Sequence, residues 1–259
     1  MKNILFLIHR EFTIFFKNLG FNSFFYFLFP LLTYLFIVIL FSNLFELNTF
    51  KTHAPHMNYS YYAFSSILFV CTAMISFISP ILLIIRDNNH LDYMYTSKLN
   101  YLHYFGSVII SVFIFSYIEF IISLFISNQL IDSVLIYWDQ IFHFFIVIFP
   151  TVLFFLMLGL LLSNFVKNYR TLLLVSIILF LLLAFGSFTF IPIYYFSDTL
   201  NYVSFTKTYN IIFQLYDMLI SILENKTLGL QTFIISIFLS IIFYGLHLFI
   251  YYKKRKLNK

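Results

Sequence analysis

The stretch YYAFSSILFVCTAMISFISPILLII, residues 61–85, decides the fold class of this chain. It contains no charged side chain, and the polar run RDNNHLDYMYTSK, residues 86–98, follows it at once. A helix needs about 20 mostly apolar residues to cross the ~30 Å hydrocarbon core of a bilayer. The stretch therefore predicts a membrane-spanning helix, and the polar run marks the point where the chain leaves the membrane.

The composition extends this prediction to the whole chain. Hydrophobic residues make up 62% of the 259 residues, charged residues make up 10%, and the mean hydropathy is +0.95. Soluble domains are only roughly half apolar. We therefore expect an all-α polytopic membrane protein with a single domain, residues 1–259. The lone cysteine, Cys71, lies in an apolar run, so neither a disulfide framework nor a thiolate metal site is expected.

Six apolar runs are long enough to cross the membrane as helices. The first is too long for the apolar part of a cleavable signal, and no small-residue cleavage pattern follows it. We therefore expect six membrane spans. They cover residues 21–41, 61–85, 104–126, 141–162, 171–190 and 232–252.

The distribution of Lys and Arg predicts the orientation of these spans. With six spans both termini lie on one side, and all but three of the 15 basic residues fall on that side, including those of the tail at residues 253–259. Cytoplasmic loops of membrane proteins carry the excess of Lys and Arg. We therefore expect both termini in the cytoplasm. The exceptions are Lys51, Lys207 and Lys226.

The N-terminal segment, residues 1–20, has the pattern of a helix that lies on the inner membrane surface. Cationic side chains above an apolar face suit the anionic lipids of the cytoplasmic leaflet. The apolar face holds Leu5, Ile8, Phe12, Phe15, Phe16 and Leu19, and the basic residues Lys2, Arg10 and Lys17 cluster opposite. Membrane lipids are therefore an expected partner of this segment.

A second amphipathic pattern covers residues 209–224, within the outer segment 191–230. Its polar residues step by four and three, which places them on one stripe of a helix. They are Asn210, Gln214, Asp217, Ser221 and Glu224. A seventh span here would move the basic tail outside, so we expect a helix at the outer interface or dipping into it. A helix packed against the other spans is the alternative.

The sequence lacks the motifs of a membrane-bound ATPase or hydrolase. The six glycines do not form a phosphate-binding Gly-x-x-x-x-Gly-Lys-Ser/Thr loop, and neither Gly-x-Ser-x-Gly nor His-Glu-x-x-His occurs. His53 and His56 have no carboxylate cluster beside them. We therefore expect no catalytic residue, no directly bound cofactor, no metal site and no nucleic-acid partner.

Glu119 is the one ionisable residue deep in a predicted span. It lies about 15 residues into the third span, or ~23 Å along a helix. A carboxylate at that depth usually faces the bundle interior or a cavity. It marks either a polar point in a substrate path or subunit interface, or a glutamate that is protonated or reaches back to the interface.

The order of these elements, and three stretches within them, resemble the permease subunits of type-2 ABC exporters. Arg10-Glu11 opens the first helix, and Pro30 in FYFLFPLLTYLF, residues 25–36, stands where the family has a proline in its first span. YYAFSSILF and ISPILLIIRDNNHLDYMYTSKL match the second span running into a cytoplasmic segment, with Arg86-Asp87 where Arg-Glu is common. FGSFTFIPIYYFSDTLNYVSF, residues 185–205, is similar to the outer segment. The family's Gly-Thr-x-Glu pattern is absent.

This resemblance implies a subunit of the bacterial inner (plasma) membrane that works with a separate ATPase. Two permeases, identical or different, would pair with two ATPase subunits that bind ATP and Mg²⁺. Residues 86–100 would form a coupling helix docked in a groove of the ATPase. Its apolar anchors would be Leu91, Met94 and Tyr95, and its polar contacts Arg86, Asp87, Asp92 and Lys98, with Arg10 and Glu11 as a second contact. The substrate would be lipid-linked, a polysaccharide, or amphiphilic and drug-like.

Two other functional classes are alternatives. A non-catalytic subunit for membrane assembly or cofactor biogenesis would have a similar layout. A membrane-embedded enzyme would need His, Asp, Ser or Glu at matching depths in several spans, and Glu119 is the one deeply placed acid. A neighbouring ATPase gene would favour transport, and a neighbouring cytochrome operon would favour assembly.

Overall fold

The computed structural model describes residues 2–17, 28, 30–35, 59–96, 101–130, 138–193, 201–223 and 229–257, and these ranges contain helices, turns and loops but no strand. Five of the helices are long and apolar enough to cross a membrane. They span Tyr62–Asp87, Leu102–Gln129, Gln140–Ser163, Tyr169–Gly186 and Leu230–Lys253. These helices overlap five of the six predicted spans. The remaining predicted span, 21–41, lies outside the described residues except at 28 and 30–35.

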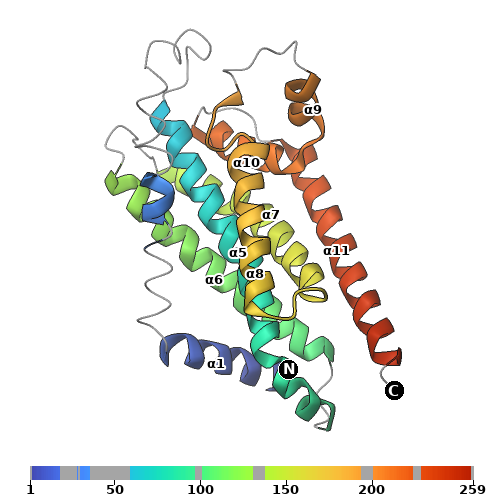
Figure 1. Ribbon diagram of the computed structural model, residues 1–259. Helices are drawn as coiled ribbons and strands as arrows, with labels where there is room; N and C mark the ends of the chain where they lie inside the picture. The colour runs from blue at the N-terminus through green and yellow to red at the C-terminus, as the bar shows by residue number, and fades with distance from the viewer. Residues whose placement is uncertain are drawn as a thin grey trace.

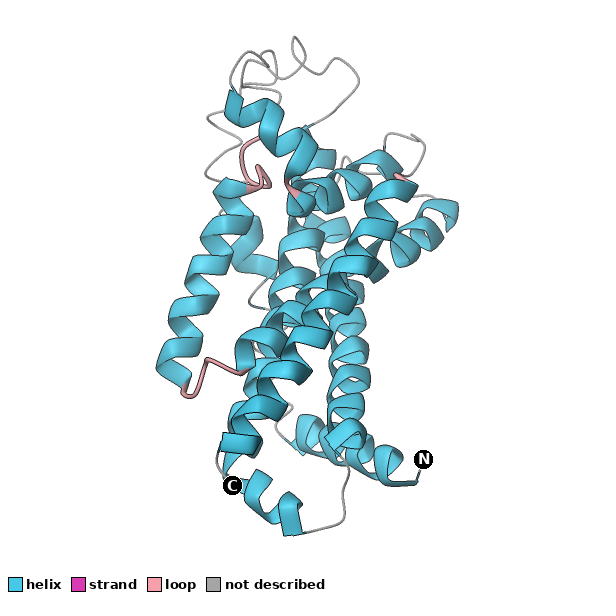
Figure 2. Cartoon of the chain, turned by 90° about the vertical axis from the view of Figure 1, so that its right-hand side faces the viewer, coloured by secondary structure: helices cyan, strands magenta, loops and turns pink. Residues whose placement is uncertain are grey.

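The long helices run side by side, and the shorter ones lie at the two ends of the bundle (Figure 1). In chain order the helices are α1 (Lys2–Lys17), α5 (Tyr59–Thr96), α6 (Tyr101–Leu130), α7 (Trp138–Ser163), α8 (Tyr169–Leu181) with its π-helical continuation η2 (Leu182–Gly186), α9 (Asn201–Tyr209), α10 (Ile211–Leu223) and α11 (Leu230–Leu257). Helix α1 crosses the lower end of the bundle, and both chain termini lie at that end (Figures 1 and 2). Helices α9 and α10 lie at the opposite end.

Helix α5 is the centre of the bundle. It packs against α6, α7, α8 and α10, and 72% of an apolar 18-residue stretch of this helix is buried, compared with 17% for such a stretch of α11. A helix that is apolar all round is expected to be covered on all sides. The aromatic residues Phe64, Phe69 and Phe77 of α5 are at most 1% exposed. The outer helices α8 and α11 therefore leave most of their apolar surface for lipid or for another subunit.

The contact between α5 and α7 depends on a glycine. A Cβ atom on Gly159 of α7 would collide with the Phe77 carbonyl oxygen and would lie 2.8 Å from Cγ of Pro80. Both Phe77 and Pro80 belong to α5. Because glycine has no side chain, the backbones of α5 and α7 can approach closely at this point. The apolar run at residues 61–85 thus forms the helix on which the others pack.

The chain leaves α8 at the upper end through an irregular segment whose polar groups α5 satisfies. The η2 turn ends at Gly186, and Phe188 has a positive φ of 54°. The hydroxyl of Tyr62 donates to the Phe188 carbonyl, and that of Ser66 donates to the Thr189 carbonyl. Backbone groups that leave a helix within a membrane must find partners inside the protein. These contacts anchor the end of the fourth described span on the central helix.

Helix α10 occupies the position that the second amphipathic pattern predicts. It packs against α5 and α7, which is the alternative arrangement for this segment. Eight of its residues are buried, and they include Tyr216 and Leu219 at 0% exposure. Asn210 begins the helix, because its Oδ1 accepts hydrogen bonds from the backbone N–H groups of Ile212 and Phe213 at 3.0 and 3.3 Å. The apolar face of α10 thus faces the other helices.

Candidate functional site

Four charged side chains from α1 and α5 meet at the end of the bundle that holds the termini. Nη2 of Arg10 lies 2.6 Å from Oδ2 of Asp87, and Nη2 of Arg86 lies 2.8 Å from each carboxylate oxygen of Glu11. Each arginine also bonds the acid that follows it in sequence, at 2.7 Å for Arg10 and Glu11 and at 2.9 Å for Arg86 and Asp87. We call these four residues the ion ring. It attaches α1 directly to α5.

The acids of the ion ring are buried, and its arginines are partly exposed. Glu11 and Asp87 are each 3% exposed, whereas the side chains of Arg10 and Arg86 are 30% and 29% exposed. The hydroxyl of the buried Tyr104, from α6, adds a hydrogen bond of 3.1 Å to Oδ2 of Asp87. The ring therefore connects three helices.

The charges of the ion ring balance. Two cations face two anions, so the cost of removing these groups from water is offset by charge-assisted hydrogen bonds. Burial opposes the charge on Arg10, but the hydrogen bond to Glu11 and the attraction of Asp87 outweigh burial and raise the pKa of Arg10 above its ordinary value. Arg10 therefore stays charged throughout the physiological pH range.

The structure brings together four of the residues predicted to contact an ATPase. Arg10, Glu11, Arg86 and Asp87 bond one another across two helices, so the buried acids are engaged within this chain. This mutual pairing is the feature that the sequence did not predict. Two Arg-acid dipeptides, at residues 10–11 and 86–87, were the signal that could have indicated it.

The remaining predicted contacts lie beyond the ion ring on the same helix. Leu91, Asp92, Met94 and Tyr95 belong to the last part of α5, which continues as a helix to Thr96, and Lys98 lies outside the described residues. The 38 residues of α5 correspond to ~57 Å of helix, well beyond the ~30 Å hydrocarbon core. The predicted coupling segment is therefore, through Thr96, an extension of a span, and no turn separates the two.

Glu119 lies in the interior of the bundle, on α6. It is 0% exposed, so its side chain is covered by protein. Oγ of Ser123 donates a hydrogen bond of 3.0 Å to Oε1 of Glu119. The other oxygen, Oε2, has no hydrogen-bond partner in the part of the chain that the structure describes. The carboxyl is therefore covered by protein, which is compatible both with a polar point on a path and with a protonated glutamate.

A band of small polar residues runs along α5 and α6 around Glu119. Oγ of Ser76 donates a hydrogen bond of 2.9 Å to Oγ of Ser116. Sγ of Cys71, also on α5, lies 3.6 Å from Oγ1 of Thr33. We call five hydroxyl residues of the two helices the hydroxyl seam, and each of them is 0% exposed. They are Thr72 and Ser76 on α5, and Ser116, Ser123 and Ser127 on α6.

The seam on α6 was visible in the sequence as a spacing. Ser116, Glu119, Ser123 and Ser127 follow one another by three, four and four residues, which places them on one face of a helix. Sequence reasoning selected the glutamate alone, because the surrounding run is so apolar. The structure shows that this face points inward and meets Ser76 of α5.

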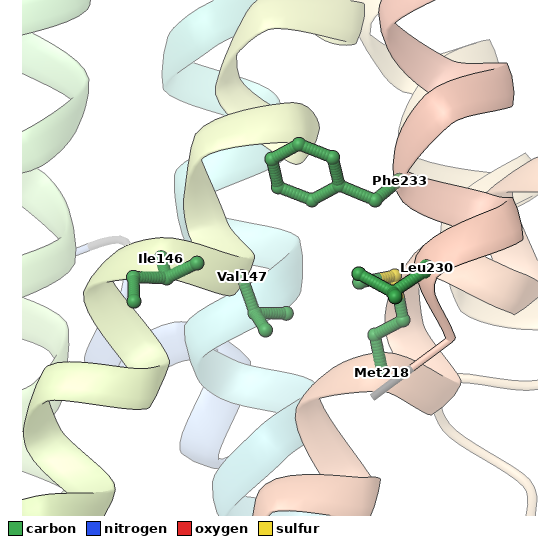
Figure 3. Close-up of a pocket in the computed structure, with 5 residues that line it drawn as sticks. All are labelled: Ile146, Val147, Met218, Leu230 and Phe233. Carbon is green, nitrogen blue, oxygen red and sulfur yellow. The ribbon is translucent and has the colours of Figure 1, made fainter. Parts of the chain in front are cut away.

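A small apolar cavity lies at the other end of the bundle, between α7, α10 and α11. Figure 3 shows the side chains of Ile146, Val147, Met218, Leu230 and Phe233 around it. Its volume is about 130 Å³, and no polar side chain lines it. A cavity of this kind offers neither a hydrogen bond nor a charge to a ligand, so it is not a chemical site.

The structure and the comparisons add no metal site and no relative. The described residues contain no group of three or more His, Cys, Asp or Glu side chains that could hold a metal ion. His53 and His56 lie outside the described residues. The chain matches no protein-family model, and no curated protein or solved structure is significantly similar to it.

Proposed function

We propose that this chain is the permease subunit of an ATP-driven exporter of the type-2 ABC kind. One observation carries the proposal: the ion ring attaches α1 to α5 just where α5 extends beyond the span. A transport subunit without its own ATPase must receive mechanical work from a partner. A surface helix joined to a span by buried charge pairs is suited to receive it.

The path of the force follows from the continuity of α5. A push on residues 91–95 passes along one uninterrupted helix into the centre of the bundle. The same push reaches α1 through the ion ring, because breaking a buried charge pair leaves an uncompensated charge. The central helix and the surface helix would therefore move together when the partner changes shape.

The docking surface is the last part of α5. Leu91, Met94 and Tyr95 follow the i, i+3, i+4 spacing of helices that bind in grooves. The partner would be an ATPase subunit that binds ATP and Mg²⁺, present in two copies with a second permease subunit. The excess of Lys and Arg on this side supports a cytoplasmic position for this end of the protein, which would lie in the bacterial inner membrane.

The substrate class follows from the interior of the bundle. The core is mainly aromatic and aliphatic, and Glu119 with the hydroxyl seam is one of its polar regions. This combination suits an amphiphile, such as a lipid-linked saccharide or a drug-like molecule, moved from the cytoplasmic side outward. Glu119 would be a polar point on its path.

The test is a triple substitution of Leu91, Met94 and Tyr95 by alanine, followed by affinity purification from native membranes. We expect loss of the ATPase subunit that co-purifies with the unaltered chain. The matched control replaces three exposed residues of α9, at the opposite end of the bundle, by alanine: Tyr202, Phe205 and Tyr209. This variant should still co-purify with the ATPase subunit. A complex that survives the first triple substitution with unchanged ATP hydrolysis would refute the docking proposal.

A further inference from the structure

Glu119 differs from the other buried acids in its hydrogen bonds. A carboxylate has two oxygens, and each of them can accept about two hydrogen bonds. Glu119 receives one, from Ser123 to Oε1, and Oε2 has no partner among the described residues. Glu11, by contrast, is bonded by both Arg10 and Arg86.

No positive charge lies near Glu119 in the described helices around it. The stretches 62–85 of α5, 102–129 of α6 and 140–163 of α7 contain neither Lys nor Arg. The other titratable side chains of these stretches are Tyr62 and Cys71 on α5, His103, Tyr104 and Tyr117 on α6, and His143 on α7, with Tyr34 in the stretch 30–35. His103 lies 16 residues before Glu119, or ~24 Å along α6. Helix α1, which also packs against α6, carries Lys2, Arg10 and Lys17, and Arg10 is paired in the ion ring. His143 of α7 is exposed, near the start of that helix. Among the residues that the structure describes, an ionised Glu119 would therefore be buried without a counter-charge.

Burial decides between the two forms of this carboxyl. An ionised carboxylate without a partner is strongly disfavoured in a nonpolar interior, whereas a neutral acid needs only hydrogen bonds. The observed bond fits the neutral form: Oε1 accepts from Ser123 as the carbonyl oxygen, and Oε2 is left to carry the proton. One accepted hydrogen bond and no counter-charge among the described residues thus fit a neutral carboxylic acid better than a carboxylate.

We propose that Glu119 and the hydroxyl seam form a proton-binding site in the membrane-embedded part of the protein. Ser123 orients the carboxyl through Oε1, and the proton resides on Oε2. Thr72 and Ser127 also have hydroxyl oxygens without partners among the described residues, so the two helices offer further polar atoms along the same band. This site requires no ATPase partner, and it stands or falls separately from the proposed function.

Infrared spectroscopy of the full chain in lipid vesicles at neutral pH tests the proposal. We expect the carbonyl stretch of a protonated carboxylic acid in the unaltered protein and its loss in the Glu119→Gln variant. The Ser123→Ala variant should keep the band and shift it to higher frequency, because the carbonyl loses a hydrogen bond. The Glu11→Gln variant should leave the band unchanged.

Two results would overturn the proposal. One is the absence of an acid carbonyl band from the unaltered protein at neutral pH, and the other is a band that persists in Glu119→Gln. If that variant does not fold, carbon-13 labelling of glutamate in the unaltered protein replaces it. A shift of the acid band on labelling would then support the site, and an unshifted band would contradict it.

Discussion

The ion ring and Glu119 are two solutions to the same problem, a carboxyl group removed from water. In the ring, Glu11 and Asp87 each contact two arginines. In the bundle, Glu119 contacts one serine. Burial alone therefore does not determine what an acid does. Its partners decide whether it joins two helices as an anion or holds a proton as a neutral acid.

The two sites also differ in what a substitution should cost. Removing one partner of a buried charge pair leaves the other charge uncompensated, which typically costs about 3–5 kcal/mol. Replacing a neutral acid by an amide of the same shape leaves no such charge. The comparison therefore predicts large effects at the ring and small ones at Glu119.

The largest effect is expected for Arg86→Ala. This change leaves Arg10 as the one cation of the ring that faces Glu11 and Asp87. We expect the free energy of unfolding to fall by about 2–3 kcal/mol. This loss is smaller than for a fully buried pair, because the Arg86 side chain is 29% exposed. Denaturant titration in detergent micelles measures it. The exposed Lys167→Ala serves as the control and should stay within about 0.5 kcal/mol. Equal stability of the two variants would contradict the structural role of the ring.

A charge exchange across the ring should restore part of this loss. Glu11→Arg and Arg86→Glu each create like-charge contacts, whereas the double variant faces two arginines of α1 with two acids of α5. We expect the double variant to be more stable than either single variant, with a coupling energy of about 1–2 kcal/mol from a double-mutant cycle. If the stability losses of the two single variants simply add in the double variant, residues 11 and 86 do not interact across the two helices.

A smaller effect is expected for Tyr104→Phe. It removes the hydrogen bond to Asp87 but leaves both arginines in place, so the loss should be about 1–2 kcal/mol. The same denaturant titration measures it. The variant Tyr209→Phe, at a position on α9 that is 71% exposed, is the matched control and should behave like the unaltered protein. A loss of stability as large as that of Arg86→Ala would contradict this prediction, because Tyr104 would then stabilise the ring by more than one hydrogen bond.

The smallest effect on stability is expected for Glu119→Gln. The amide keeps the shape and can still accept from Ser123, so the change should stay within about 1 kcal/mol. If Glu119 is a polar point on the substrate path, the same variant should alter the transport rate while its membrane expression stays normal. Transport assays in vesicles, normalised to protein, measure this. An unchanged rate would leave the proton site without a part in transport.

The sequence predicted the spans better than the contacts between them. Apolar run length depends on residues close in the chain, and it located the helices that contain residues 61–85 and 232–252. The ion ring joins residues 75 and 77 positions apart, and nothing local in Arg10-Glu11 indicates that Arg86-Asp87 is its partner. The sequence therefore predicted these residues as contacts to another protein.

The segment 209–224 shows the same limit. Its polar stripe predicted a helix, and α10 is that helix. Hydropathy reports that one face is apolar but not whether lipid or protein covers it. Packing of Tyr216 against Tyr62 and Phe69 of α5, with ring centroids 5.4 and 5.6 Å apart, decides this in favour of protein. The seam around Glu119 was missed for a related reason, because isolated serines scarcely change the mean hydropathy of a span.

In the proposed exporter, the end of the molecule with the ion ring works on a partner ATPase. The most direct test of this interaction is purification of the unaltered chain from its native membrane in mild detergent, with mass spectrometry of everything that remains bound. The account predicts a nucleotide-binding ATPase subunit in equal amount, with ATP hydrolysis in the purified complex. A chain that purifies without any ATPase, and with no ATP hydrolysis, would contradict it.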